Sequence, residues 1–167
     1  MNNFIISAVG SDRPGIVSQV SGVITSHGGN IEESRMSRLG SDFAIIMLVS
    51  VTPDWVESLK IALQSINELT IICKPTKTKE IKEGLKYEIS LSGADNEGIV
   101  KVLSKYLAEK SINIVEMETY ISQASVSGTP LFNLMATIII SENTDLEEIQ
   151  SELALIAEKL GVEITVN

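Results

Sequence analysis

Apolar residues along the chain switch between two periods. They recur at every second position in runs typical of half-buried strands, for example Tyr87, Ile89 and Leu91. They recur at spacings of three and four in runs typical of amphipathic helices, for example Ile16, Val17, Val20, Val23 and Ile24. The two periods follow one another in the order strand, helix, strand, strand, helix, strand, and this order occurs twice.

The two occurrences are copies of one unit. Nine of the 24 positions from 10 to 33 are identical to the positions 83 residues further along the chain. A βαββαβ order predicts an α+β fold of two ferredoxin-like modules, each a four-stranded antiparallel sheet with two helices on one face. We expect a first domain at 1–75, a charged linker at 76–85 and a second domain at 86–167.

Turn residues mark the ends of the predicted elements. Asp12 is predicted to cap the first helix, with Pro14 in its first turn, where a missing N–H group costs nothing. The glycines at 28–29 are predicted to end that helix. A tight hairpin is expected at 40–42, and a second helix is expected to open at Thr52.

Charge and composition narrow the class of protein. The formal net charge is −9, and the acidity is concentrated in the second half: residues 1–77 hold six basic and seven acidic groups, residues 78–167 seven and fifteen. An acidic surface repels phosphates, so we expect no direct nucleic-acid binding. There is no apolar run near the length of a membrane span, no secretory signal and a single cysteine, Cys73, so we expect a cytoplasmic protein without disulfides.

The turn from the first strand into the first helix has the chemistry to bind a free amino acid. Gly10 lets a ligand approach the backbone, and Gly15 leaves the helix N–H groups accessible to a carboxylate. Asp12 can hold an ammonium group, and Asn30 offers both a donor and an acceptor. The same residues also fit purely structural roles in capping, turn formation and packing, and the residue types do not decide between the two.

Catalysis has little support in the sequence, and we expect no enzyme activity, no metal site and no cofactor. His27, the only histidine, is expected to bond the last carbonyls of a helix, and Cys73 is expected to lie in the core. Glu32 and Glu33 are adjacent on a predicted strand, so they are expected to point to opposite faces and not to form an acid–base pair. Glu116 and Glu118 are expected to share a solvated face.

The run from Asp12 to Val17, Asp-Arg-Pro-Gly-Ile-Val, followed by Gly-Gly-Asn-Ile at 28–31, resembles the ACT domain, a βαββαβ module that senses amino acids. The longer run from Asn30 to Met36 and the hairpin after it resemble the glycine cleavage system transcriptional repressor family, whose members hold two such modules. The first module also resembles the N-terminal domain of formyltetrahydrofolate deformylases. A second copy stands here where those enzymes have their hydrolase domain, so their activity is not implied.

The resemblance implies a regulatory protein that binds a small amino acid, with glycine the leading expectation, and that acts through a protein partner such as a DNA-binding activator. A homodimer is also possible. The alternative is a dimerisation or docking module that regulates a metabolic enzyme without a ligand of its own. In the family, ligands bind at module interfaces. The matching positions of the first copy are Gly10, Ser11, Asp12, Gly15, Asn30 and Ile31. A weaker second site is implied at Asp95, Gly98, Asn113 and Ile114.

Overall fold

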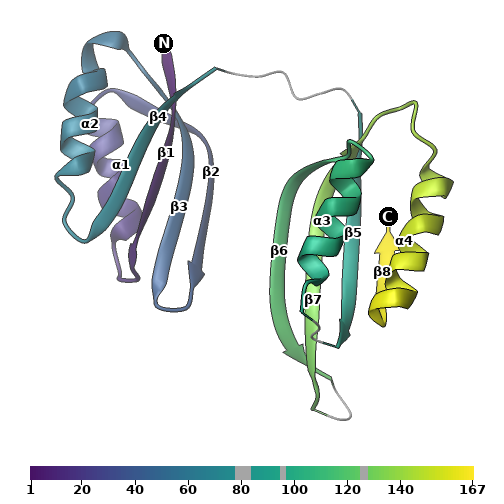
Figure 1. The fold of residues 1–167 in the computed structure, drawn as a ribbon. Helices are drawn as coiled ribbons and strands as arrows, with labels where there is room; N and C mark the ends of the chain where they lie inside the picture. Colours follow the sequence, from purple (N-terminus) through teal and green to yellow (C-terminus); the bar gives the residue numbers. More distant parts are fainter. Residues whose placement is uncertain (78–83, 95–96, 125–127) are drawn as a thin grey trace. The chain divides into compact units, whose positions relative to one another are not determined.

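The computed structural model describes residues 1–77, 84–94, 97–124 and 128–167. The chain forms two compact units, Met1–Glu80 and Ile81–Asn167, which we call the first and the second module (Figure 1). The junction lies inside the predicted linker 76–85. Residues 78–83 are outside the described part of the chain, so the character of that linker stays a prediction.

Each module has the predicted βαββαβ order. In the first module the elements are β1 (Asn2–Ser11), α1 (Ile16–Ser26), β2 (Gly29–Leu39), β3 (Asp42–Val51), the short 3-10 turn η1 (Pro53–Trp55), α2 (Val56–Gln64) and β4 (Leu69–Thr76). In the second they are β5 (Leu85–Ala94), α3 (Ile99–Glu109), β6 (Asn113–Gln123), β7 (Pro130–Ile140), α4 (Leu146–Leu160) and β8 (Val162–Val166).

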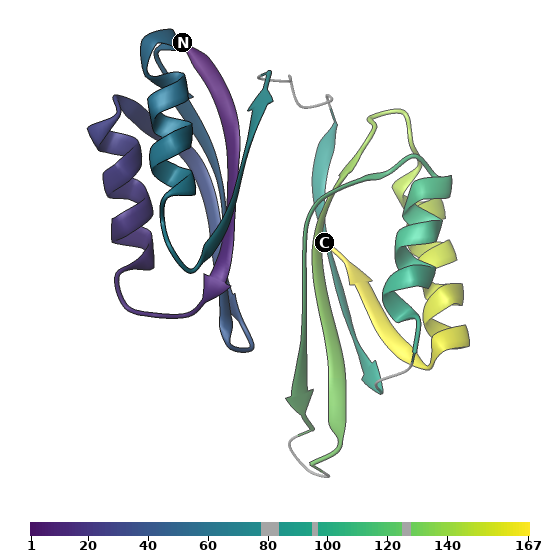
Figure 2. The same ribbon diagram turned by 60° about the vertical axis from the view of Figure 1, so that its left-hand side comes forward.

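The two sheets have the same topology. Their strand orders are β2-β3-β1-β4 and β6-β7-β5-β8, and every neighbouring pair is antiparallel. In both modules the two helices cover one face of the sheet, and we call the other the open face (Figure 2). The α+β class and the paired ferredoxin-like modules predicted from the sequence are therefore confirmed.

The core of each module lies between the sheet and its two helices. In α1 the buried positions are Ile16, Val20 and Ile24, four residues apart, and they pack on the alternate buried residues of β1 and β3. Val17, part of the predicted stripe, is 39 % exposed because it lies one position off that line. The equivalent buried residues of α3 are Ile99, Leu103 and Leu107.

The start of α1 differs from the prediction. The N-cap is Gly15, in the left-handed conformation with φ 90°, and no side chain caps the helix. Asp12 and Pro14 both precede this residue, so the predictions of an Asp12 cap and of Pro14 in the first helical turn were wrong. Gly98 starts α3 with φ 88° in the same way. A Cβ at either glycine would meet no neighbour, so the backbone angle alone explains the residue type.

Candidate functional site

The β1–α1 turn of the first module lies beside a cavity of about 550 Å³. The first N–H groups of α1 have no intrahelical partner, and because Gly15 carries no side chain they also lack a side-chain cap. Such a helix start carries a partial positive charge and favours anions. The residues that line the cavity are Asp12, Arg13, Gly15, Ile16, Val17, Ser18, Ser21 and Phe43.

Two charged side chains, Asp12 and Arg13, give the cavity lining both a negative and a positive charge. The Asp12 carboxylate lies 3.8 Å from the Arg38 guanidinium, and the Arg13 Nε lies 3.2 Å from a carboxylate oxygen of Glu68. Arg13 also donates to the Gln19 side chain at 2.6 Å. Exposed ion pairs of this kind are weak, typically below about 1 kcal/mol, so a ligand can exchange for them. The arrangement can hold a carboxylate at the helix start and an ammonium group at Asp12.

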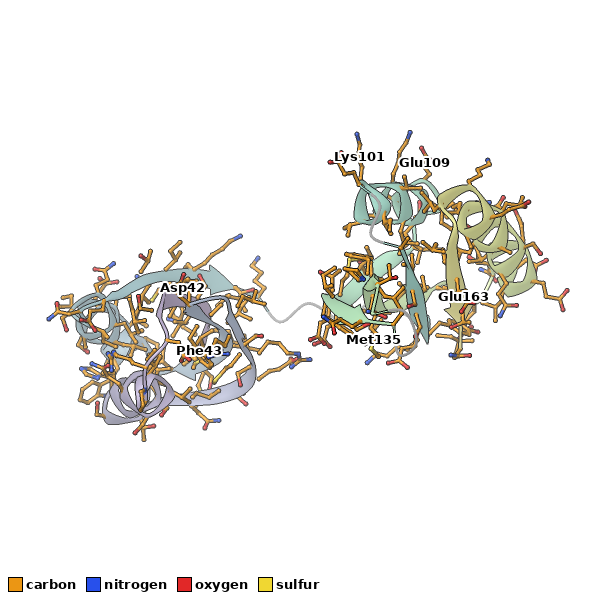
Figure 3. All side chains as sticks on the ribbon, turned by 90° about the horizontal axis from the view of Figure 1, so that it is seen from below. Asp42, Phe43, Lys101, Glu109, Met135 and Glu163 are labelled. Carbon is orange, nitrogen blue, oxygen red and sulfur yellow. The ribbon has the colours of Figure 1, made fainter. Side chains whose placement is uncertain are left out.

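Six of the cavity residues lie outside the set expected from the sequence, namely Arg13, Ile16, Val17, Ser18, Ser21 and Phe43. Ser18 and Ser21 lie three positions apart on α1, and that spacing puts them on one face of the helix. Phe43 comes from the β2–β3 hairpin (Figure 3). The helical spacing of the serines was visible in the sequence. The approach of the hairpin was not, since it depends on sheet register.

Gly10 has a packing role in the structure. A Cβ on this residue would lie 2.2 Å from the Glu68 carbonyl oxygen, so the absence of a side chain lets the chain entering β4 run directly beside β1. Gly93 of the second module does the same for Val162. Ser11, the last residue of β1, pairs with Asp42. The space beside Gly10 is therefore filled by the protein itself.

The structure does not bring Asn30 and Ile31 to the β1–α1 turn of their own module. Asn30 pairs with Ser50 and, through it, lies level with Asn3, whereas Ser11 is at the other end of β1. At about 3.3 Å per residue, the two ends are separated by roughly 25 Å. β3 also lies between β1 and β2. Within one module Asn30 therefore cannot reach a ligand at this turn, and its part in a ligand site stays a prediction.

At this end of β2, Asn30 belongs to a small hydrogen-bonded cluster. The Ser50 hydroxyl donates to the Glu32 carboxylate at 2.5 Å, and the Asn30 amide donates to the same carboxylate oxygen at 3.1 Å. These bonds, that from Ser50 first, lower the pKa of Glu32. Because a bulge at Glu32 shifts the β2–β3 register, Glu32 and Glu33 both lie toward the open face, and the prediction of opposite faces was wrong.

The second module keeps the backbone of this cluster and loses its polar partners. Asn113 begins β6, Ile114 packs on the core, and a bulge follows at the same place. The residues equivalent to Glu32 and Ser50 are Val115 and Ile139, so the carboxylate and hydroxyl are absent there. Asp95, in the equivalent turn, lies outside the described residues, so the weaker second site stays a prediction.

His27 and Cys73 make packing and hydrogen-bond contacts that are typical of residues with a structural role. The His27 Nδ1–H donates to the Val23 carbonyl at 2.8 Å, as predicted, and its ring meets Trp55 edge-on at 5.9 Å between centroids. Cys73 packs against the first core, and burial raises the pKa of its thiol. Within the described ranges we find no cluster of side chains that could hold a metal ion, and no helix long and apolar enough to cross a membrane.

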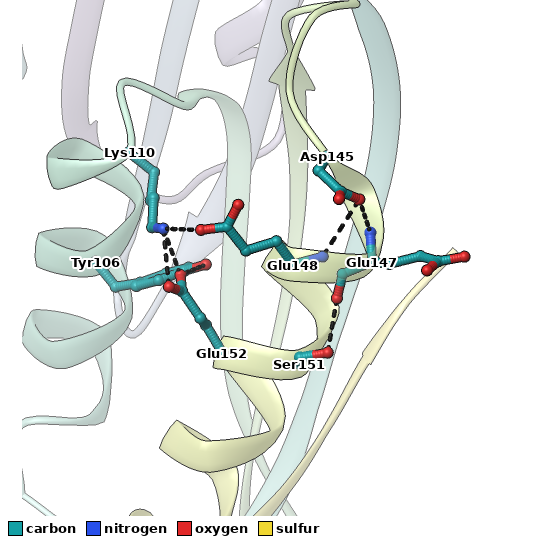
Figure 4. A network of polar contacts seen from close by, with 7 residues as sticks. All are labelled: Tyr106, Lys110, Asp145, Glu147, Glu148, Ser151 and Glu152. Atoms are coloured by element: carbon teal, nitrogen blue, oxygen red, sulfur yellow. Dashed lines mark hydrogen bonds and ion pairs between the residues drawn. The ribbon is translucent and has the colours of Figure 1, made fainter.

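A polar network that sequence reasoning missed joins α3 to α4. The Lys110 ammonium lies 2.7 Å from one Glu152 oxygen and 3.0 Å from Glu148, and the Tyr106 hydroxyl donates to Glu152 at 2.9 Å (Figure 4). Hydrogen bonds from Lys110 and then Tyr106 lower the pKa of Glu152, while hydrogen bonds to Glu152 and Glu148 raise that of Lys110. The network lies between the two helices of the second module, and its role is structural.

The sequence was compared with models of known protein families. The family model of the ACT domain matches residues 2–73 and again residues 89–167. The chain belongs to the ACT domain family. The two matches coincide with the two βαββαβ modules, and the β1–α1 turn and the start of β2 fall inside the first of them.

Individual relatives match either nearly the whole chain or less than half of it. The chain is 22 % identical over 167 residues to the glycine cleavage system transcriptional repressor of Escherichia coli K12, covering 98 % of this chain and 88 % of the relative. It is 36 % identical over 69 residues to a UPF0237 protein of Methanococcus maripaludis, covering 40 % of this chain and 76 % of that protein. A crystal structure of an unknown protein from Galdieria sulphuraria superposes with a TM-score of 0.88 at 33 % identity, covering 99 % and 97 % of the two chains.

Proposed function

We propose that this protein is a non-enzymatic regulator that binds a small amino acid at the β1–α1 turn of its first module. The signal passes to a protein partner that controls transcription of amino-acid, most simply glycine, metabolism. Membership of the ACT domain family and similarity to a glycine cleavage repressor over nearly the whole chain support a regulatory role. One observation carries the ligand proposal: the uncapped start of α1 opens on a cavity with Asp12 at its edge.

The charge of the cavity favours a zwitterion. A volume of about 550 Å³ lies within the usual range of ligand sites, and the helix start and Asp12 offer opposite charges to a carboxylate and an ammonium group. Asn30 and Ile31 can contribute only from another module, because they lie at the far end of their own sheet. The ligand would then be shared between two modules, as the family resemblance implies.

A protein partner fits the charge better than direct contact with DNA does. The net charge of −9 gives an unfavourable long-range interaction with phosphates. We therefore place the DNA contact on a partner, with this chain as its ligand-sensitive regulator.

Calorimetry of the full chain against the twenty amino acids at millimolar concentration tests the ligand proposal. We expect binding of glycine or another small amino acid, and a loss of about 1–3 kcal/mol in the Asp12→Asn variant, since a charge-assisted bond is removed. The matched control is Asp95→Asn, at the equivalent position of the second module, and it should change the affinity less. No heat from any of the twenty amino acids would rule out sensing, and equal losses in both variants would reject the first module as the main site.

A docking or dimerisation module without a ligand is the second candidate. The observation in its favour is the distance between the two predicted half-sites, which leaves the first module alone with only part of a site. The two candidates differ in their thermal response. A sensor is stabilised by RT ln(1 + [L]/Kd), so its melting temperature rises with ligand, whereas a pure docking module does not respond.

A further inference from the structure

The open face of the second module is strongly acidic. Four exposed glutamates lie on it, namely Glu88, Glu116, Glu118 and Glu163. Lys86 is the one cation that the described strand residues place on this side of the sheet. Glu116 and Glu118 share an exposed face, as predicted from the sequence. The side chains of Met135 and Glu163 extend away from α3 on this side of the module (Figure 3).

The strand register places these carboxylates toward the two edges of the face. Glu116 and Glu118 lie two positions apart on the edge strand β6, which separates them by about 7 Å along the strand. Glu163 lies on the opposite edge strand, β8, and Glu88 lies on the neighbouring strand β5. Three strand spacings of about 4.8 Å put the two edge strands roughly 14 Å apart. A cationic chain lying between them can therefore reach carboxylates on both sides.

The floor between the two edges is hollowed and uncharged. One hollow of about 220 Å³ lies beside the glutamates of β5 and β6, and a second of about 260 Å³ lies beside Glu163. Met135 lines both hollows, so they adjoin. The Asn133 side chain is held in the floor by Ser92, which donates to its carbonyl at 3.0 Å, and by Ser122, which accepts from its amide at 2.8 Å. The floor is therefore polar enough to bond the backbone of a bound segment.

The helix layer of the same module, which consists of α3, Lys110 and α4, does not share this imbalance of charge. It carries four lysines and five glutamates, several of them joined in ion pairs (Figure 4). On the open face, Glu88, Glu118 and Glu163 form no ion pair with any residue that the structure describes. In the first module the position of Glu88 is taken by Ile5, so the fold itself does not require the charge. Because a surface that serves solubility mixes both signs, unpaired charge of one sign indicates a surface that meets a cation.

The charge and shape of the face select the class of molecule that can cover it. A second copy of this face, or a nucleic acid, brings further negative charge and is repelled. A cationic protein segment is attracted, and an extended segment can direct alternate side chains to the two edges. Tyr120, which is 48 % exposed beside the second hollow, offers its ring to an arginine.

We infer that the open face of the second module is the docking surface for an extended, lysine- and arginine-rich segment of a protein partner. This inference rests on the proposed function for the class of partner, because a protein that contacts DNA carries a basic surface for the phosphates. The acidic face and the DNA phosphates then compete for the same basic groups, which gives the regulator a direct way to weaken DNA binding by its partner.

Fluorescence anisotropy of a labelled decalysine peptide titrated with the full chain tests the docking surface, at about 0.15 M salt so that long-range attraction is screened. The combined variant Glu88→Gln, Glu118→Gln and Glu163→Gln should raise the dissociation constant roughly tenfold or more, since three charge pairs are lost. The matched control replaces three exposed glutamates of the helix layer, by Glu109→Gln, Glu147→Gln and Glu158→Gln. The two variants have the same net charge, and the control should change the constant by less than about twofold.

Two single substitutions repeat the test at constant charge. Met135→Arg places a cation at the centre of the open face and should weaken peptide binding. Leu155→Arg adds the same charge on the exposed side of α4 and should not. Because Met135 is 41 % and Leu155 57 % exposed, both variants should keep the fold, and circular dichroism checks this.

The outcomes separate this inference from its alternatives. A wild-type chain that does not bind decalysine at millimolar concentration overturns the inference, as do equal losses of affinity in the two triple variants. Binding of spermine as tight as that of decalysine would assign the face to small polyamines and would overturn it too. The assay contains no amino acid, so a chain that gives no heat with the amino-acid panel can still bind the peptide, and the ligand proposal and the docking surface fail separately.

Discussion

The two modules use different side-chain contacts to hold their two helices together, although the contacts begin at equivalent positions of the chain. In the first, His27 after α1 donates to Val23 and meets the ring of Trp55 before α2. In the second, the residue at the position of His27 is Lys110, and it forms ion pairs with Glu148 and Glu152 of α4. An aromatic contact and a charged network therefore serve one architectural purpose. Polar side chains outside the core can therefore change without altering the fold.

The largest expected effect is a loss of stability that is confined to the module whose core is mutated. Leu63 of α2 and Leu153 of α4 are equivalent and fully buried, so Leu→Ala at either should cost about 2–5 kcal/mol of unfolding free energy in its own module. Trp55, the only tryptophan, reports on the first module alone. We expect Leu63→Ala to shift the denaturation midpoint seen by tryptophan fluorescence, and Leu153→Ala to leave it unchanged while shifting part of the circular dichroism signal. Equal shifts of the tryptophan transition in both variants would mean that the modules unfold as one unit.

The architecture could be predicted from sequence because its signals are local. Strand alternation, helix spacing and the repeat at 10–33 each depend on a few neighbouring residues, and they predict the α+β fold and the order of the strands and α-helices. The prediction of Asp12 as a cap failed for a local reason too. The left-handed Gly15 places the helix start three residues later than the capping pattern indicated.

The site was harder to predict because it depends on sheet topology. Asn30 follows the first helix in sequence and looks close to the β1–α1 turn, but β3 separates β2 from β1 and the register carries Asn30 to the far end. Phe43 is the opposite case. It is distant from the β1–α1 turn in sequence, but its pairing with Gly10 brings it to the cavity beside that turn. The network at Lys110 was missed because its partners lie 38 and 42 residues away.

A smaller effect tests whether the glycines of β1 and β5 have equivalent packing roles. A Cβ at Gly10 would lie 2.2 Å from the Glu68 carbonyl oxygen, and one at Gly93 would lie 2.5 Å from Val162. Both Gly→Ala variants should lose about 1–3 kcal/mol of unfolding free energy, because the neighbouring strand must move. Gly22, inside α1 with no neighbour within 4 Å, is the control: Gly22→Ala should gain about 0.5–1 kcal/mol through helix propensity. Chemical denaturation measures all three, and a neutral Gly10→Ala would show that β4 does not need this close approach.

The smallest expected effect concerns the stability at low pH of the second module, whose helices are joined by charged side chains. The Glu152 pKa is held below its ordinary value of 4.5, chiefly by Lys110, so the ionised carboxylate stabilises the folded second module. That contribution is complete above about pH 4.5 and is lost as the pH falls through the folded pKa, because the unfolded state then binds the proton more readily. Lys110→Met removes the cation, so the melting temperature of this module should fall less steeply below about pH 4.5 than in the wild type. Lys105→Met is the control, since Lys105 pairs with exposed Glu109 at 3.6 Å, and it should leave the slope unchanged. Identical slopes for Lys110→Met and the wild type would show that the charged network does not make the second module acid-sensitive.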